Sequence, residues 1–235
     1  MVLARFLSFK VLDNYKNKPF FLLPYMEEMS ASRILKESKT KVIVITGSPG
    51  VGKSTVSKAL ADKLEALYVS LTDVVKNEKL TLRFDEQRDT FIADLNRLSK
   101  RVEEIIGDAP GDVIIEGHYA PDVVPASLAS HVFVLRFDPD SLRTRLEKRG
   151  YSEKKILENI ESEALDICLV NAIERYGEDK VDEIDATQRT VEEVVEEITQ
   201  VLGGRRPMKV GKVDWLGKME LEGRLEEFLS KLNWV

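Results

Sequence analysis

The sequence contains few of the residues that form disulfide bonds or structural metal sites. It contains one cysteine, Cys168, and two histidines. A single thiol excludes an internal disulfide and a cysteine-based zinc site. With 43% hydrophobic residues in a chain of 235, a packed core is expected instead. This length suits one α/β domain with additions at its ends. The default compartment is intracellular, and we expect a cytoplasmic protein.

Long apolar runs and an excess of positive charge are also missing. Lys10, Asp13, Lys16 and Lys18 interrupt the apolar stretches near the start. No run reaches the roughly 18 residues that a membrane-spanning helix needs, so no membrane partner is expected. The net charge of −6 excludes a global basic field for nucleic acids and leaves only local basic clusters. The guanine-specifying pattern N-K-x-D is absent, which disfavours a GTPase switch.

Short apolar runs alternate with amphipathic segments along the middle of the chain. The runs that predict buried strands are 41–46, 67–71, 112–116, 131–136 and 181–185. Helical periodicity or capping signals mark 53–64, 72–106, 141–148, 152–176 and 190–202. Strands that alternate with helices predict βαβ units. We therefore expect an α/β fold in three layers, α/β/α, with a central five-stranded parallel sheet.

We expect three parts along the chain: an extension over 1–38, a phosphate-binding domain over 39–202, and a linker followed by a helix over 203–235. Glycines, a proline and basic residues predict the linker at 203–217. An amphipathic pattern predicts one last helix at 217–232. Trp215, Leu221 and Phe228 are its candidate docking residues.

The sequence GSPGVGKST follows the first predicted strand and precedes the first predicted helix. It matches the phosphate-loop pattern G-x-x-x-x-G-K-[ST] in the arrangement that this motif requires. Gly50 and Gly52 permit a backbone that turns successive N–H groups inward, and these groups bind phosphate oxygens together with the helix N-terminus. Lys53 reaches the β and γ phosphates, Ser54 offers a hydroxyl to Mg²⁺, and Thr55 steadies the loop or the α-phosphate. The alternative is a tight strand-to-helix turn that only uses glycine.

The third strand of the predicted sheet ends in a carboxylate and is followed by an imidazole. Ligands of open α/β sheets lie at the carboxyl ends of the strands. Glu116 is therefore a candidate to hold Mg²⁺ or to orient a nucleophile, and a solvated acid is the alternative. His118 can position a water or a phosphate, because imidazole titrates near neutral pH. A histidine that is satisfied by a backbone carbonyl is equally compatible with the sequence.

Basic residues cluster around a helix break at Gly150 and Tyr151. They are Arg143, Arg145, Lys148, Arg149, Lys154 and Lys155. Two helices with a basic rim around their junction are typical of a lid that closes over phosphates. A solvated basic helix face is the alternative.

A second charged stretch lies between the second and third predicted strands. Monophosphate kinases insert their acceptor-binding region in this slot. The candidate residues are Asp73, Lys76, Arg83, Asp85 and Arg88. On composition alone, the stretch is only a charged helical surface.

Together these segments resemble the adenylate kinase isoenzyme 6 family in its archaeal form. The phosphate loop, FDEQRD at 84–89 and VIIEGH at 113–118 correspond to segments of that family. A longer match is HVFVLRFDPDSLRTRLEKRGYSEKKILENIESE at 131–163. The resemblance extends over about 41–202. One departure is Glu116, which stands where the family commonly has an aspartate.

The resemblance implies a P-loop NTPase fold with a short lid near 148–158 and an acceptor region near 70–93. It implies transfer of the γ-phosphoryl group of ATP to AMP or a related monophosphate, with Mg²⁺, together with ATP hydrolysis. Arg149 would be the lid arginine that binds the nucleotide, with Lys53, Glu116 and His118 beside the reacting phosphates. Gln188 and Arg189 would lie near the adenine base.

Family members also act in maturation of the small ribosomal subunit. The resemblance therefore adds a small-subunit platform protein and pre-ribosomal RNA as expected partners. A nucleoside monophosphate kinase and a ribosome-assembly ATPase both remain open at this point. The presence of both an acceptor slot and a lid favours the kinase, because hydrolysis alone requires neither.

Overall fold

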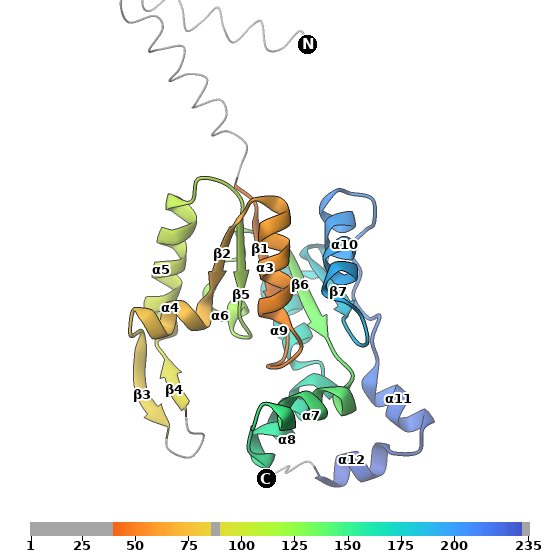
Figure 1. The fold of residues 1–235 in the computed structure, drawn as a ribbon. Coiled ribbons are helices and arrows are strands. Elements are labelled where there is room, and N and C mark those ends of the chain that lie inside the picture. The colour runs from red at the N-terminus through yellow and green to blue at the C-terminus, as the bar shows by residue number, and fades with distance from the viewer. Residues whose placement is uncertain (1–39, 86–89, 232–235) are drawn as a thin grey trace, which may run out of the picture. The chain divides into compact units, whose positions relative to one another are not determined.

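A parallel sheet of five strands organises the part of the chain that the computed structural model describes, residues 40–85 and 90–231. The strands are β1 (Val42–Thr46), β2 (Leu67–Ser70), β5 (Val113–Glu116), β6 (Ala129–Arg136) and β7 (Val181–Asp185). Their order is β2-β5-β1-β6-β7 (Figure 1). Every neighbouring pair is parallel. The predicted five-stranded parallel sheet is therefore confirmed.

Alternate residues of the sheet enter two separate cores, which makes the fold three-layered. Val42 and Val44 of β1 pack on one face, and Ile43 and Ile45 pack on the other. The first core is completed by α4 (Leu71–Asn77), α5 (Leu95–Asp108), α6 (Ala120–Val123) and α9 (Ile167–Tyr176). The second core is completed by α3 (Lys53–Leu64), α7 (Pro139–Lys148), α8 (Glu153–Ala164) and α10 (Val191–Leu202). Buried β-branched strands with helices on both faces are the expected form of a parallel sheet.

The prediction that 72–106 is mostly helical was wrong for the middle of this segment. Helix α4 ends at Asn77, and an antiparallel hairpin of β3 (Thr81–Asp85) and β4 (Thr90–Ala93) precedes α5. Leu82 and Phe84 alternate with charged or polar neighbours, which is strand periodicity. The charged residues around them obscured this short pattern.

The expected helix at 152–176 is two helices. Helix α8 ends at Ala164, and α9 begins at Ile167 after Asp166, whose φ is 58°. The carboxylate of Asp166 pairs with the buried guanidinium of Arg136. We attribute the break to this tertiary contact, because no glycine or proline marks it in the sequence. A short 3₁₀ helix, η3 (Glu178–Lys180), leads into β7.

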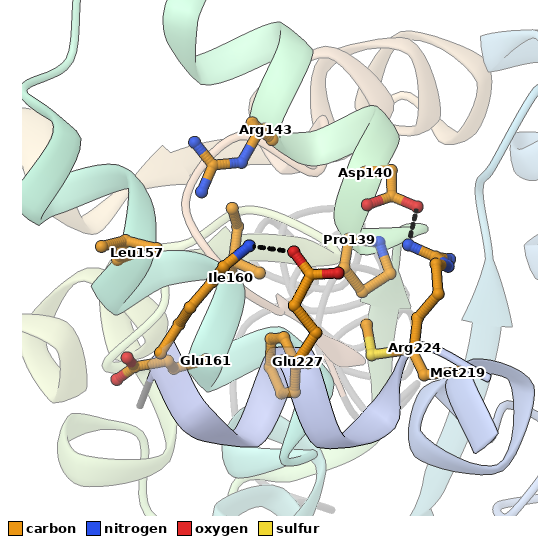
Figure 2. Close-up of a pocket in the computed structure, with 11 residues that line it drawn as sticks. Pro139, Asp140, Arg143, Leu157, Ile160, Glu161, Met219, Arg224 and Glu227 are labelled. Carbon is orange, nitrogen blue, oxygen red and sulfur yellow. Dashed lines mark hydrogen bonds and ion pairs between the residues drawn. The ribbon is translucent and has the colours of Figure 1, made fainter. Parts of the chain in front are cut away.

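The C-terminal part also differs from the expectation of one helix. It contains α11 (Trp215–Leu221) and α12 (Leu225–Lys231), separated at Gly223, whose φ is 68°. Trp215 is buried and Phe228 packs against the second core, but Leu221 is 91% exposed and was wrongly expected to dock. Figure 2 shows α12 beside α7 and α8, where Arg224 pairs with Asp140 of α7 at 2.9 Å.

Within the described residues, no helix combines the length and apolar character that crossing a membrane requires.

Candidate nucleotide-binding site

The phosphate loop connects β1 to α3 at the carboxyl end of the central strand (Figure 1). Glycine is required at two of its positions for different reasons. A Cβ atom at Gly47 would lie 2.3 Å from the carbonyl oxygen of Leu135, so the backbones approach too closely for any side chain. Gly52 has a φ of 110° and precedes the first residue of α3, a conformation that is natural only for glycine. The loop therefore has the backbone geometry that the motif predicted.

Lys53 is buried at the start of α3. Its Nζ donates hydrogen bonds to the carbonyl oxygens of Gly47 at 2.9 Å and Ser48 at 3.0 Å. Burial lowers the pKa of Lys53, while the negative charges of Glu116 and Glu163 oppose the shift. Both the carbonyls and the acids favour a charged ammonium group at this point. This is a suitable cation for phosphate oxygens.

Ser54 and Glu116 come together beside Lys53. The Ser54 hydroxyl donates to Glu116 Oε1 at 3.1 Å, although 62 residues separate them in the chain. Mg²⁺ is usually held by one or two carboxylates, with hydroxyl, water and phosphate oxygens completing the shell. The described residues contain no group of three His, Cys, Asp or Glu side chains that could hold a metal. The pair therefore fits a Mg²⁺ ion that arrives with a nucleotide.

Tyr68 contributes to this pair and was missed by the sequence analysis. Its hydroxyl donates to the same Glu116 oxygen at 3.3 Å. Burial first, and the charge of Glu116 second, raise the pKa of Tyr68 to about 12. The tyrosine therefore stays protonated and fixes the orientation of the carboxylate. Its position follows from the β2–β5 register, which no local motif could have predicted.

His118 follows β5 and packs edge-on against Tyr119, with ring centroids 4.4 Å apart. Its side chain keeps solvent access, but surrounding protein atoms, and then the charge of Lys53, lower the pKa to about 4. The imidazole is therefore neutral near physiological pH. It can accept or donate a hydrogen bond in this state, but it carries no positive charge for phosphate binding.

The basic residues around the break at Gly150 have different partners in the structure. Arg143 pairs with Glu153 at 2.8 Å, and the Arg145 guanidinium lies 3.7 Å from the centre of the Phe137 ring. Arg149 caps the end of α7, and Gly150 follows it with a φ of 73°. The charge of Arg149 is close enough to lower the pKa of Lys53. Arg149 at the end of α7 is thus linked electrostatically to the phosphate loop.

A cavity of about 410 Å³ opens beside the phosphate loop. Thr55, Arg149 and Arg189 line it with polar groups, and Val191 and Val194 supply part of an apolar wall. Such a mixture of apolar surface and a few polar groups suits a nucleobase and its sugar.

The two residues expected at the base differ in their placement. Arg189 lines the cavity and donates to the carbonyl oxygen of Asp185 at 3.0 Å. Gln188 precedes it in the left-handed region with a φ of 52°, and its side chain is exposed. The structure therefore brings Arg189 to the cavity and leaves Gln188 outside its lining.

The acceptor candidates lie on two elements. Asp73 and Lys76 belong to α4, and Arg83 and Asp85 belong to β3. Arg88 lies outside the described residues. Figure 1 shows the β3–β4 hairpin and helices α7 and α8 beyond the same end of the sheet as the phosphate loop. The hairpin and the two helices thus lie near the edge of the sheet where ligands of this fold class bind.

The fold and the phosphate loop define the class of protein: a P-loop protein with an α/β/α sandwich. The family described as "AAA domain" matches residues 43–166, just over half of the chain. The structure of shikimate kinase from Acinetobacter baumannii in complex with shikimate superimposes with a TM-score of 0.54 at 15% identity. The match covers 74% of this chain and 98% of that one, and it shows likeness of fold.

Relatives identify the particular family. A protein of Methanocaldococcus jannaschii with the name "Putative adenylate kinase" is 41% identical over 176 residues, 75% of this chain and 93% of its own length. A protein of the same name from Archaeoglobus fulgidus is 39% identical over 199 residues, 81% of this chain and 99% of its own length. The chain belongs to this archaeal family.

Proposed function

We propose that the protein is a nucleoside monophosphate kinase, which transfers the γ-phosphoryl group of ATP to AMP or a related monophosphate. The observation that carries the proposal is the meeting of Lys53, Ser54 and Glu116 at one phosphate loop, beneath a lid that ends in Arg149. The relatives bear the name of adenylate kinase, which supports this reaction over other phosphoryl transfers.

Each of these groups has a role that follows from its chemistry. The loop N–H groups and the Lys53 ammonium hold the β and γ phosphates. Ser54 and Glu116 hold Mg²⁺, which neutralises phosphate charge when it is bound. Arg149 adds a guanidinium to the charge that develops on the transferring group. Phosphoryl transfer needs mainly positioning and charge neutralisation from a protein, so this set is sufficient for the reaction.

Transfer to a monophosphate also requires that water be kept from the γ-phosphate. The break at Gly150 allows the lid to close over the phosphates. Arg83 and Asp85 on the hairpin, with Asp73 and Lys76 on α4, are the residues that we assign to the acceptor. The extra methylene of Glu116, relative to aspartate, favours a metal contact through water.

A panel of acceptors tests this proposal. Purified protein with ATP and Mg²⁺ is supplied in turn with AMP, dAMP, CMP, UMP and GMP, and ADP formation is measured against a sample without acceptor. We expect at least one acceptor, with AMP first, to raise ADP formation well above hydrolysis. Binding of Mg²⁺·ATP without acceleration by any acceptor would overturn the kinase proposal while preserving the nucleotide site.

ATP hydrolysis and ribosome maturation stay predictions that follow from the family resemblance. The same assay checks them when a small-subunit platform protein, or RNA from the small subunit, replaces the monophosphate. Turnover that rises more with the ribosomal partner than with AMP would favour the ribosome-assembly ATPase as the main role.

A further inference from the structure

The segment after α10 is held to the edge of the sheet by buried carboxylates. We call residues 205–219 the C-terminal strap. The backbone N–H of Lys209 donates to Asp182 Oδ1 at 2.8 Å, and its carbonyl accepts from the N–H of Glu183 at 3.0 Å. The N–H of Lys212 donates to Glu183 Oε2 at 2.6 Å. Both acids are fully buried, so the strap also gives hydrogen-bond partners to groups that burial would otherwise penalise.

The strap reaches the phosphate loop through one side chain of α8. Trp215 is buried, and its indole N–H donates to Glu163 Oε1 at 3.1 Å. The other oxygen of Glu163 accepts from the Ser48 hydroxyl at 2.7 Å. Ser48 is fully buried and lies in the phosphate loop itself. Two hydrogen bonds therefore connect Trp215 to the loop through Glu163, a connection that we call the strap relay.

Glu163 also acts on Lys53, from the same position. Its negative charge raises the pKa of Lys53 against the effect of burial. Ser48, which Glu163 holds by the hydroxyl, presents its carbonyl oxygen to the Lys53 ammonium at 3.0 Å. Ser48 thus contacts Glu163 through its hydroxyl and Lys53 through its carbonyl oxygen.

Glu163 is oriented by several groups, so its carboxylate has little freedom. Arg136 Nε donates to Oε1 at 2.8 Å, and the N–H of Phe137 donates to the same oxygen at 3.0 Å. Trp215 is the third donor to this oxygen, and Ser48 is the donor to the other. A phenyl ring at this position would keep an aromatic side chain, although a smaller one, but it would not donate this hydrogen bond.

We propose that Glu163 and Trp215 are positioning residues for the phosphate loop, and that they act through Ser48 on the geometry with which the loop and Lys53 bind ATP. The proposal rests on the proposed function in so far as the loop is an ATP site. It gives the strap a role in nucleotide affinity in addition to its packing.

Trp215→Phe tests the relay, because it keeps an aromatic ring and removes the N–H. We expect the Kd for Mg²⁺·ATP to rise about three- to tenfold, which corresponds to one lost hydrogen bond. The KM for the acceptor should stay within about twofold of wild type, because the residues assigned to the acceptor lie on α4 and β3. Lys218→Ala is the matched control. It removes the ion pair of Lys218 with Asp138 at 2.6 Å and the ammonium that lies 5.6 Å from the centre of the Trp215 ring, but it keeps the indole N–H and Glu163. It should leave the Kd within about twofold.

A double-mutant cycle with Ser48→Ala distinguishes the relay from a general loss of packing. If the relay acts as a unit, Ser48→Ala raises the Kd by a similar factor, and the double variant binds no more weakly than Ser48→Ala alone. Additive effects would overturn the proposal, as would an unchanged Kd in folded Trp215→Phe. If Trp215→Phe does not fold, unchanged binding in Ser48→Ala overturns it instead. Wild-type protein that binds no Mg²⁺·ATP would refute the nucleotide site itself, a failure that is visible before any variant is made.

Discussion

The phosphate loop and the β3–β4 hairpin differ in how deeply their side chains are buried, although we propose that both take part in the same reaction. In the loop, Ser48 and Val51 are at most 1% exposed, and Lys53 is held by two backbone carbonyls. In the hairpin, Leu82 is 67% and Phe91 is 64% exposed. Well-packed, hydrogen-bonded segments resist local opening, whereas exposed segments open at little cost.

This difference suggests that the two regions have different tasks in the proposed reaction. In the proposed reaction, ATP binds a loop whose geometry is already fixed by the core, which reduces the free-energy cost of ordering the loop. The hairpin is stabilised by its antiparallel pairing and by the Phe84–Phe91 ring contact, with centroids 4.9 Å apart. Such an element can shift toward an acceptor without disturbing the sheet.

The largest expected effect is at the phosphate loop, the better packed of the two regions. Lys53→Ala removes the ammonium group at the phosphate loop, and we expect turnover to fall by about a thousandfold or more. The measurement is steady-state ADP formation, with circular dichroism to establish folding. Lys63→Ala, at an exposed position of the same helix, is the control and should retain activity. Normal turnover in folded Lys53→Ala would exclude this site.

Arg149→Ala should have the next largest effect, because it removes a positive charge at the junction of the lid helices. We expect kcat to fall about a hundredfold, with a smaller change in the Kd for Mg²⁺·ATP. Lys154→Ala, on the other side of the Gly150 break, serves as the comparison and should change kcat little. Equal kinetics for wild type and Arg149→Ala would discard the assignment of the lid arginine.

On the hairpin, Arg83→Ala should weaken binding of the monophosphate but not of ATP. We expect the KM for the monophosphate to rise about tenfold, because a charge-assisted contact to phosphate is lost. The Kd for ATP and the melting temperature should be unchanged, since Arg83 is exposed. Thr81→Ala on the same strand is the matched control. A rise in the Kd for ATP would show that the hairpin and the loop are not independent.

The smallest effect is expected at His118. Its pKa of about 4 in the folded protein means that it does not titrate between about pH 6 and pH 8, so it adds no step to the rate profile there. Below its ordinary pKa of 6.5, the unfolded chain takes up a proton that the folded protein does not. Stability should therefore decline from about pH 6.5 toward pH 4.

Two measurements check the His118 prediction. In wild type, the NMR titration of the His118 ring should have its midpoint near the low pKa, and a midpoint close to 6.5 would contradict the prediction. The difference in unfolding free energy between wild type and His118→Gln should depend on pH only in the acidic range.

Local sequence patterns were sufficient to predict the features that depend only on residues adjacent in the chain. The phosphate loop was predicted with its residues, because glycine spacing and the following lysine are a local requirement of phosphate binding. All five buried strands were predicted within a few residues, since continuous β-branched runs indicate them directly. Thr190 and Glu193 form the capping box that their spacing predicted.

Local patterns failed where distant contacts decide the outcome. The hairpin was predicted as helix because its short alternation is embedded in charged residues. The break at Asp166 depends on Arg136, 30 residues earlier in the chain. Tyr68 reaches Glu116 only because β2 and β5 are neighbours in the sheet.

The sequence by itself determined the sheet, the phosphate loop and the family, because periodicity and motif spacing are properties of adjacent residues. The tertiary structure alone decided that Ser48, Glu163 and Trp215 form one connection, and that Arg189 rather than Gln188 lines the cavity. Hydrogen bonds between segments far apart in the chain depend on how the layers pack, and no local pattern encodes that packing.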